Sequence, residues 1–544
     1  MTAATIPAEL TRIPAGPGLG NAFWTAGSVG QLQVQRCGSC DAMVHPSHEL
    51  CPDCGSEELR PEPVSGDATV VAVTVNHQPW TPELSQPYVI AVVSLDDAVH
   101  LRLVTNIVDC TADQVCIGMR VRAQFRQLDD VWIPVFAPTG VAPSAVTVDE
   151  PLTPAPPKPS RRRFEREVAI TGLGKSEFAR RAEGPGADLV LSACRAAIAD
   201  AGLEPGDIDG ISAYCGADQA TIEIGRVAGE LGIEQAWYSG AHEVPGQTGA
   251  VIAAMLSVAA GFCRHVLCWT VVTSQARPGL YTGSETGRVS GEPQWYEPFG
   301  ALSPANWIAL AASQYLHRYG VSREALGWVA ISARRHAARN PNAIYRSPLS
   351  MSDYLAARSV STPFGLYDCD VPCDGAVAVV VSSAAAAADL RHPVIGVDAV
   401  GTRITEVQSW IDGTLTHQPN LFGPAAHLWS RASVGRDDVD FANLYDGFTF
   451  NVLSWLEALG FCGLGEAGDF VSGGTRIGPE GTLVVNPHGG QLSAGRSNGF
   501  GQLHEAVVQL RGDAGARQVA RAQVGLVTSG GGIPANCMLL TRAS

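Results

Sequence analysis

The sequence is short of positive charge. It has 37 lysine and arginine residues against 53 aspartate and glutamate residues in 544, a formal net charge of -16. This balance argues against non-specific nucleic-acid binding, which needs a basic surface. The sequence also lacks an uninterrupted apolar run long enough to span a bilayer, and its start lacks a basic run followed by an apolar core. We therefore expect a cytoplasmic protein without a membrane span or a signal peptide.

Cysteine is present, but most of it is scattered. The 14 cysteines of this large acidic chain suit a reducing compartment better than a disulfide scaffold. Four of them form two CxxC pairs separated by a short loop, Cys37 with Cys40 and Cys51 with Cys54. Two such pairs can place four thiolates tetrahedrally around Zn²⁺, with no fifth ligand in sight. We predict a closed, structural zinc site in a ribbon over 25–66; coincidence or a redox pair is the alternative.

Short β-branched runs replace this pattern between residues 67 and 140. The runs cover 69–75, 88–95, 100–107, 119–127 and 131–136. Five short strands with turn residues between them are typical of a small Greek-key barrel of the OB-fold type. The segment 141–164 is rich in proline, which predicts an extended linker.

Strand-like and helical segments alternate after the linker. This alternation predicts an α/β domain with a mainly parallel sheet that helices cover on both faces. The segment 202–216 is echoed by 433–447, with apolar, aspartate and tyrosine residues in matching places. We interpret the echo as a duplicated α/β unit, with halves of roughly 165–390 and 391–544.

The stretch from Leu444 to Gly501 combines the features of a binding site. Tyr445 falls at the end of a short apolar strand, before a helix that apolar spacing predicts up to Gly460. Unpaired N–H groups and the helix dipole at that point favour an anion, including a phenolate. The glycine-rich run 486–501 lets the backbone approach a ligand closely. Together these features predict a site for a substrate that becomes negatively charged.

Several motifs carry a resemblance to a known family. The chain contains YDGFTF over 445–450, NPHGGQLSAGR over 486–496 and TSGGG over 528–532. With the duplicated unit, these motifs resemble the thiolase superfamily, closest to its lipid-transfer-protein branch, which is related to sterol carrier protein x. The ribbon followed by a barrel resembles the zinc-ribbon/OB-fold domain that accompanies thiolase-like enzymes and acyl-CoA hydratases. The resemblance implies a thiolase-like α/β core behind a zinc ribbon and an OB barrel.

The sequence departs from thiolases where those enzymes do their chemistry. By the resemblance, Gly246 stands in place of the nucleophilic cysteine and Thr528 in place of the second cysteine. Arg496 matches the oxyanion-hole histidine, and Tyr445 matches the asparagine of the Asn-Glu-Ala-Phe motif. A glycine cannot form an acyl-enzyme, so thiolysis through a cysteine is not expected.

A thiolase-like chain with these changes resembles the steroid side-chain aldolases of the same branch. The resemblance implies retro-aldol cleavage of a β-hydroxyacyl-CoA, on a steroid or other alicyclic compound, to a ketone or aldehyde and a shorter acyl-CoA. Two alternatives stay open: a non-catalytic lipid or acyl-CoA carrier, and an atypical thiolase or acyltransferase that uses another nucleophile.

The candidate site residues follow from this reaction. Tyr445 is the predicted base, and because the ordinary pKa of tyrosine is about 10 it needs a nearby cation. Arg496 is the natural cation and could hold the thioester oxygen, while His488 could protonate the enolate or anchor its loop. The predicted substrate-binding residues are Gly246, Gly531, Gly532 and Tyr296.

The resemblance also suggests partners. Thiolase-like folds usually pair through their central sheets, which implies a homodimer. In similar systems an acyl-CoA hydratase docks on the OB domain, so a hydratase is a candidate partner here. Coenzyme A is expected as part of the substrate.

Overall fold

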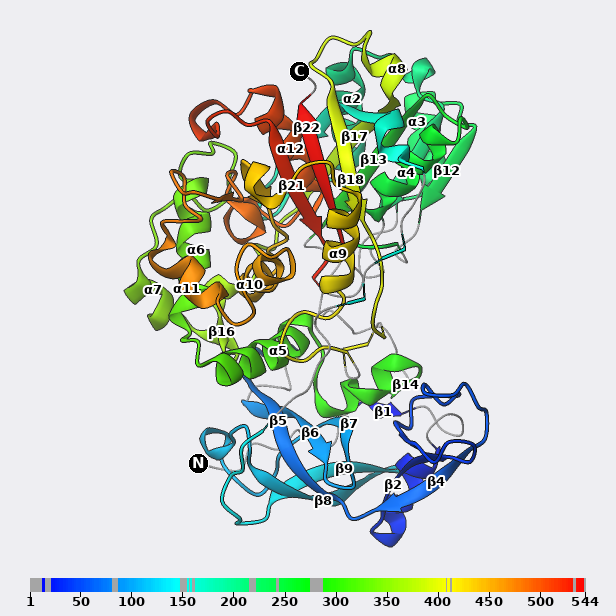
Figure 1. The fold of residues 1–544 in the computed structure, drawn as a ribbon, viewed down its shortest axis with the longest axis vertical. Coiled ribbons are helices and arrows are strands. Elements are labelled where there is room, and N and C mark those ends of the chain that lie inside the picture. The colour runs from blue at the N-terminus through cyan, green and yellow to red at the C-terminus, as the bar shows by residue number, and fades with distance from the viewer. Residues whose placement is uncertain are drawn as a thin grey trace.

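The structure of the protein is a computed structural model with two parts, an all-β N-terminal part and a larger α/β part above it in the view of Figure 1. The described residues are 12–14, 21–80, 87–146, 154–155, 157–158, 162–214, 222–240, 244–273, 287–407, 409–410, 413–531 and 535–542. None of the helices in these ranges is long and apolar enough to cross a membrane.

A small ribbon opens the all-β part. Its three strands are β2 (Leu32–Cys37), β3 (Met43–Val44) and β4 (Leu59–Val64), with β2 in the middle and both neighbours antiparallel to it. The short helix α1 (Asn21–Thr25) precedes the ribbon, and its Phe23 and Trp24 are buried in the core of the adjoining barrel.

The barrel follows the ribbon directly. Its strands are β5 (Asp67–Asn76), β6 (Tyr88–Leu95), β7 (Ala98–Thr105), β8 (Arg120–Leu128) and β9 (Val131–Pro138). β5 pairs with β6 and β8, β6 pairs with β7, and β8 pairs with β9, all antiparallel. A bridge between Ile107 and Phe136 brings the end of β7 to β9. The five strands predicted from β-branched runs are therefore all present.

A ten-stranded sheet forms the centre of the α/β part. In order, its strands are β12 (Trp237–Gly240), β11 (Gly210–Tyr214), β13 (His265–Val272), β17 (Gly375–Ser383), β10 (Val168–Lys175), β18 (Ile395–Gly401), β22 (Asn536–Arg542), β21 (Val524–Ser529), β19 (Phe441–Asn443) and β20 (Val484–Val485). The first five strands come from the first half of the core and the last five from the second half. The halves meet where β10 pairs with β18 through two residue pairs.

The expectation of a mainly parallel sheet is wrong, because the sheet is mixed. β11 is parallel to β12 and β13, and β19 is parallel to β20 and β21. β17 and β22, however, run antiparallel to both of their neighbours. Central strands that are covered on both faces read as continuous apolar runs in either direction, so the sequence pattern does not distinguish the two cases.

The predicted duplication is visible in the hydrogen bonds. Asp209, just before β11, accepts bonds from the backbone N–H groups of residues 264–265 at 2.8 and 3.0 Å. Asp440, just before β19, accepts bonds from those of residues 523–524 at 2.8 and 2.9 Å. Each aspartate thus ties the start of one central strand to the start of its parallel neighbour. The domain boundaries given above remain predictions.

Helices flank the sheet and build a lobe beside it. Those that pack on the sheet are α2 (Gly186–Ala201), α3 (Ile224–Leu231), α4 (Gly249–Ala259), α9 (Phe422–Arg431) and α12 (Phe500–Arg511). The lobe contains α5 (Pro304–Tyr319), α6 (Glu324–Ala337), α7 (Met351–Ala356), α10 (Thr449–Ala458) and α11 (Ala467–Val471). The helix predicted up to Gly460 is α10, and Gly460 has the positive φ of a helix end.

The two parts share a sheet and a core. β15 (Ser359–Ser361) comes from the α/β part but pairs with β5 of the barrel, so the barrel sheet continues into the larger part. The buried Asn306 on α5 donates from Nδ2 to Asn76 Oδ1 and to Ser361 Oγ, both at 3.0 Å. Residues 295–302 add apolar side chains to the barrel core. The all-β part is therefore an integral layer of the molecule.

We predict that Asn306→Ala weakens the joint between the parts. The change removes both bonds and leaves buried oxygens of Asn76 and Ser361 with fewer donors, which should cost about 1–3 kcal/mol of the free energy of unfolding. Thermal unfolding followed by circular dichroism measures the effect, with the exposed Asn342→Ala as the control. An unchanged unfolding midpoint in Asn306→Ala would contradict this account of the joint.

Candidate active site

Tyr445 lies where β19 ends and the chain turns toward α10. Its backbone N–H donates to Thr528 Oγ1 at 2.7 Å, and the residue is 8% exposed. A Cβ on Gly447 would lie 2.9 Å from Tyr445 Cε1, and a Cβ on Gly531 would lie 3.3 Å from the same atom. Two glycines therefore let the backbone pass close along one edge of the tyrosine ring.

Amide and guanidinium groups surround the Tyr445 hydroxyl. Gln247 Nε2 donates to it at 3.4 Å. Burial raises the pKa of Tyr445 to about 12, although Arg496 and the Gln491 amide act to lower it. The expectation that a cation and a helix start bring this group to phenolate character is wrong for the free protein. The free-energy cost of a phenolate without water is larger than the stabilisation by Arg496 and the amide. The neutral phenol is therefore the main form of Tyr445 in the free protein.

Arg496 supplies a positive charge to the site. Its Nε lies 3.5 Å from Asp370 Oδ2, and its side chain is 26% exposed. Burial lowers the pKa of Arg496, but Asp370 and Tyr445 outweigh that effect and hold this pKa above its usual value. The backbone N–H of Arg496 donates to Val371 O at 3.1 Å, and that of Asp370 donates to Gly447 O at 2.9 Å. The structure thus brings Tyr445 and Arg496 together, as predicted.

The loop at Gly246 lies against the same site. Gly246 has φ +65°, and a Cβ there would lie 2.6 Å from Asn536 Nδ2 and 2.8 Å from Ser529 O. No side chain of any kind, a cysteine included, fits this position without a shift of the backbone. Ser529 Oγ donates to Gln247 Oε1 at 3.0 Å and accepts from Thr248 N–H at 3.1 Å. Gly246 and Gly531 are thus both near Tyr445; Gly532 lies outside the described residues.

Asp446, the neighbour of Tyr445, is a further residue of the site that was not predicted from the sequence. It is fully buried, and its carboxylate accepts from Gln491 N–H at 2.9 Å, Leu492 N–H at 3.4 Å and Gln502 Nε2 at 2.9 Å. Burial raises its pKa to about 7, against these hydrogen bonds. Its place in YDGFTF, as the one carboxylate of that motif, was the available signal.

His488 is placed apart from the hydroxyl of Tyr445. Among the described residues it makes no hydrogen bond to Tyr445 or Arg496, and its carbonyl accepts from Asn340 Nδ2 at 2.9 Å. Burial, together with the nearby Lys175, holds the pKa of His488 well below its usual value. A neutral imidazole is a poor proton donor, so this geometry favours the loop-anchoring role over protonation.

Tyr296 does not belong to this site. Its ring packs edge-on against Trp307 at 5.0 Å, within the cluster that residues 295–302 form with the barrel. Tyr445 belongs to a different cluster, built around α5, α6 and α10. The prediction that Tyr296 binds substrate is therefore not supported by its position, since the residue fills the junction between the two parts.

Cysteines of the α/β part could in principle supply the other nucleophile of an atypical thiolase, but those described near the central sheet are in apolar surroundings. Cys268 is fully buried on β13, and burial raises its pKa; burial also raises that of Cys263. Cys215 lies outside the described residues. Cys373 contacts the backbone of Arg496, since its Sγ donates to Arg496 O at 3.3 Å. Burial raises the pKa of Cys373 to about 12. These three described thiols are neutral and poorly suited to nucleophilic attack.

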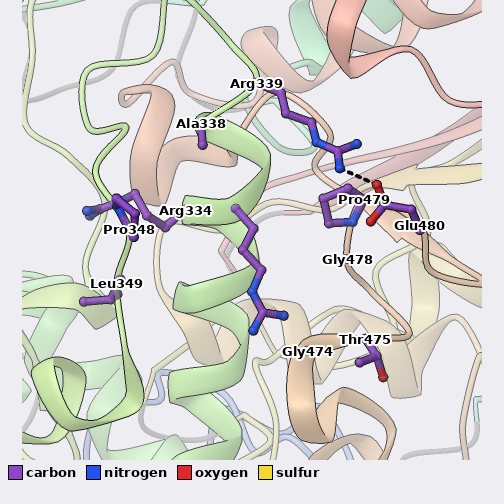
Figure 2. Close-up of a pocket in the computed structure, with 11 residues that line it drawn as sticks. Arg334, Ala338, Arg339, Pro348, Leu349, Gly474, Thr475, Gly478, Pro479 and Glu480 are labelled. Atoms are coloured by element: carbon purple, nitrogen blue, oxygen red, sulfur yellow. Dashed lines mark hydrogen bonds and ion pairs between the residues drawn. The ribbon is translucent and has the colours of Figure 1, made fainter.

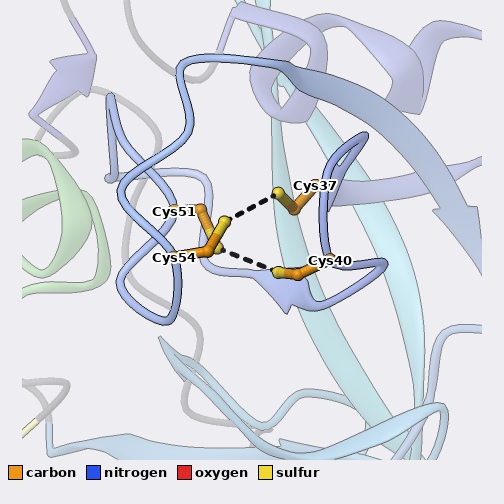
Figure 3. A group of neighbouring side chains, drawn as sticks. All are labelled: Cys37, Cys40, Cys51 and Cys54. Carbon is orange, nitrogen blue, oxygen red and sulfur yellow. Dashed lines mark hydrogen bonds between the residues drawn. The ribbon is translucent and has the colours of Figure 1, made fainter.

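The four predicted zinc ligands come together in the ribbon (Figure 3). All four sulfurs lie within 4.8 Å of one another, with Cys37 Sγ 3.6 Å from Cys54 Sγ and Cys40 Sγ 3.5 Å from Cys51 Sγ. A tetrahedral zinc site with Zn–S bonds of about 2.3 Å needs sulfurs about 3.8 Å apart. The side chains present therefore fit Zn²⁺ in a structural site of the ribbon, which is a different part of the molecule from the one that holds Tyr445.

A groove of about 630 Å³ opens between α6 and the loop at 474–480 (Figure 2). Arg334 and Arg335 of α6 and Arg339, which follows the helix, line it. Arg339 pairs with Glu480, and Arg334 donates from Nε to Ser493 Oγ at 3.2 Å. The groove is lined by none of Tyr445, Arg496, Gly246 or Gly531, so it is separate from the candidate site.

Family models match three segments of the chain. They are a thiolase C-terminal domain-like model at 415–540, a ChsH2 C-terminal OB-fold model at 61–126 and a ChsH2 rubredoxin-like zinc ribbon model at 24–60. The chain is also similar to a probable enoyl-CoA hydratase alpha subunit of Thermomonospora curvata. That relative is 38% identical over 120 residues, which are 22% of this chain and 37% of the relative.

Longer matches cover the α/β part. A steroid side-chain-cleaving aldolase of Thermomonospora curvata is 35% identical over 69% of this chain and 97% of the relative. A 17-hydroxy-3-oxo-4-pregnene-20-carboxyl-CoA lyase of Mycobacterium tuberculosis is 33% identical over 69% of this chain and 99% of the relative. The chain belongs to this aldolase family. A solved Ltp2-ChsH2(DUF35) aldolase matches with a TM-score of 0.63 and 34% identity, over 69% of this chain and 98% of that one.

Membership of this family establishes the fold of the core and shows that the protein is an enzyme. It places the aldolase on a thiolase-like α/β core and makes it an enzyme that acts on CoA compounds, as the motifs implied. The name of the solved aldolase joins two components, Ltp2 and ChsH2, and the present aldolase carries segments similar to ChsH2 in the same chain as its core.

We predict one zinc ion for each aldolase chain. Cys51→Ser should lower the zinc content measured by inductively coupled plasma mass spectrometry and destabilise the ribbon, because a structural zinc site contributes directly to folding. Cys116→Ser, which changes an exposed barrel cysteine outside the cluster, is the matched control. A zinc content equal to wild type in Cys51→Ser would refute this ligand set.

Proposed function

We propose that this aldolase cleaves a β-hydroxyacyl-CoA by a retro-aldol reaction with Tyr445 as the base. The observation that carries the proposal is the Tyr445 hydroxyl, which accepts from Gln247 Nε2 at 3.4 Å and lies within the electrostatic reach of the Arg496 guanidinium, with the backbone of Gly246 and Gly531 alongside. A base and a fixed cation at one point suit a reaction that removes a proton and creates an anion.

The substrate class follows from the relatives. One is named for a steroid side chain and the other for a 17-hydroxy-3-oxo-4-pregnene-20-carboxyl-CoA. We assign a 17-hydroxy steroid carboxyl-CoA to this chain. Cleavage between the carbon that carries the hydroxyl and the carbon next to the thioester then gives a steroid ketone and a shorter acyl-CoA.

The steps balance within the substrate. Tyr445, as the phenolate, takes the proton of the β-hydroxyl group, and the oxygen electrons form the carbonyl bond of the ketone. The Cα–Cβ bond breaks, and its electrons form the thioester enolate. The enolate carbon then takes a proton. Since the net change moves one proton from oxygen to carbon, the phenol that formed in the first step can supply it.

Arg496 stabilises the enolate in this mechanism. A permanently charged guanidinium is a poor acid but a strong hydrogen-bond donor to an anionic oxygen. Backbone N–H groups near Gly246 and Gly531 supply further donors to the thioester. His488 keeps the role of a loop anchor, because its buried neutral ring does not donate a proton readily.

The two alternative functions have less support. A carrier has no use for a base and a cation at one point, and the relatives that match 97% and 99% of their length are named as an aldolase and a lyase. An acyltransferase needs an activated nucleophile, whereas the described thiols near the site have pKa values raised by burial.

Partners and location are part of the proposal. We propose a homodimer through the central sheet, as is usual for thiolase-like folds, and a cytoplasmic enzyme. An acyl-CoA hydratase is the proposed partner of the barrel, because 22% of the chain is similar to a probable enoyl-CoA hydratase alpha subunit.

Tyr445→Phe should strongly reduce the rate of cleavage without a change in the fold. The variant loses only the hydroxyl, and loss of a general base lowers kcat by about 10²–10⁴-fold. The measurement is mass spectrometry of the steroid ketone and the acyl-CoA released from a 17-hydroxy steroid carboxyl-CoA. Tyr238→Phe, at an exposed tyrosine, is the control. Cleavage by Tyr445→Phe at the wild-type rate would discard Tyr445 as the base.

The rate should increase with pH. The pKa of Tyr445 in the free enzyme is about 12, so the active phenolate is a minor form that becomes more abundant as protons are removed. Well below that pKa, kcat/KM should rise about tenfold for each pH unit, between about pH 7 and pH 9. Steady-state kinetics over this range test the sign, with circular dichroism to verify folding. A flat or falling profile would contradict the assignment.

A further inference from the structure

Three side chains near Tyr445 end in an amide group. In each of them the amide oxygen accepts a hydrogen bond, and this bond fixes the direction of the amide. Gln247 Oε1 accepts from Ser529 Oγ at 3.0 Å, and Gln491 Oε1 accepts from Ser497 N–H at 3.0 Å. Asn451 Oδ1 accepts from Phe448 N–H at 2.7 Å. An amide whose oxygen is bound to a donor must direct its nitrogen the other way. Gln247 Nε2 donates to the tyrosine hydroxyl at 3.4 Å, and the Gln491 amide acts to lower the pKa of Tyr445. Among the described residues, Gln491 Nε2 and Asn451 Nδ2 both lack a hydrogen-bond partner, and the direction of the Asn451 amide is still to be explained.

Asn451 Nδ2 is a buried donor beside the ring of Tyr445. The residue is fully buried, and Nδ2 has no hydrogen-bond partner among the residues that the structure describes. The point where a Cβ of Gly531 would lie is 3.3 Å from Asn451 Nδ2 and 3.3 Å from Tyr445 Cε1. Both atoms therefore border the space over Gly531, and Cε1 is the ring carbon next to the one that carries the hydroxyl.

Asn451 caps the N-terminus of α10 through its oxygen, and this role does not require the amide nitrogen. Asn451 is the third residue of the helix, and its oxygen caps the N–H of Phe448. A carboxylate would make the same bond and would also suit the positive end of the helix dipole. A buried donor without a partner is unfavourable. What asparagine adds at this position is a neutral N–H group directed at the site.

We propose that Asn451 Nδ2 donates a hydrogen bond to the β-hydroxyl oxygen of the substrate, the oxygen that becomes the ketone. This inference rests on the proposed retro-aldol function and adds a catalytic residue to it. The bond stabilises the oxygen as Tyr445 removes its proton.

The thioester oxygen and the β-hydroxyl oxygen of the substrate carry different charges at the end of the cleavage step. The proposed site offers a different hydrogen-bond donor to each of them. The enolate oxygen ends the cleavage step with a negative charge, and the charged Arg496 suits it. The hydroxyl oxygen ends in a neutral carbonyl, for which a neutral donor is sufficient and a permanent cation would hold back product release. Asn451 is neutral at every pH, and it lies on the Gly531 side of the tyrosine ring.

Two variants separate the donor from the cap. Asn451→Asp keeps an oxygen for Phe448 N–H but replaces the donor with a carboxylate. Asn451→Leu is neutral and similar in size but loses both functions. We expect kcat to fall by about 10²–10³-fold in both variants, as for loss of one oxyanion donor. The cap bond is lost only in Asn451→Leu, whereas Asn451→Asp keeps it but buries a carboxylate, so circular dichroism is used to verify that both variants are folded. Binding of the 17-keto steroid product, measured by inhibition, should weaken at least tenfold in both.

The controls keep this inference apart from the proposed function. Wild type and Tyr445→Phe are assayed beside the variants with the same 17-hydroxy steroid carboxyl-CoA. If wild type cleaves the ester and either folded Asn451 variant keeps kcat and ketone inhibition within twofold, Asn451 is not the donor and the function stands. If wild type cleaves no 17-hydroxy ester, the inference falls together with the proposed function.

Discussion

A single buried carboxylate organises the site of this aldolase. Asp446 follows Tyr445 directly and accepts hydrogen bonds from two backbone N–H groups of the segment at 491–492 and from Gln502 on α12. A Cβ on Gly490 would lie 1.8 Å from Asp446 Oδ2, so only glycine allows this approach. The end of β19, the glycine-rich segment and α12 are thereby held in one arrangement, and the positions of Tyr445 and Gln491 depend on it.

Burial has two opposite effects on Tyr445, the proposed base. The surroundings that exclude water from Tyr445 raise its pKa to about 12 and make the phenolate scarce. The same low polarity strengthens every interaction between the phenolate, Arg496 and the nearby amides once the charge has formed. A site of this kind keeps the proposed base neutral in the free enzyme and holds the neighbouring polar groups in fixed positions, so the proposed reaction would need little rearrangement.

Local patterns made much of this structure predictable. The barrel strands, the ribbon cysteines and the repeated aspartates at 209 and 440 follow from residues that are close in the sequence. The proximity of Tyr445 and Arg496 followed from the family resemblance. The direction of β17 and β22, the location of Tyr296 at the junction and the high pKa of Tyr445 did not follow, because each depends on what packs around it from distant segments. Asp446 and Asn451 were not predicted, because the contacts of Asp446 with residues 491–502 and the position of Asn451 Nδ2 beside Gly531 depend on the folded structure.

The pairing of β15 with β5 has a consequence for how the enzyme behaves on dilution. Two separate chains joined by such a contact would dissociate as their concentration falls. Here both strands belong to one polypeptide, and the contact forms at an effective concentration that the chain itself sets. The barrel and the core are therefore made in equal amounts and stay together at any enzyme concentration, without a binding equilibrium between them.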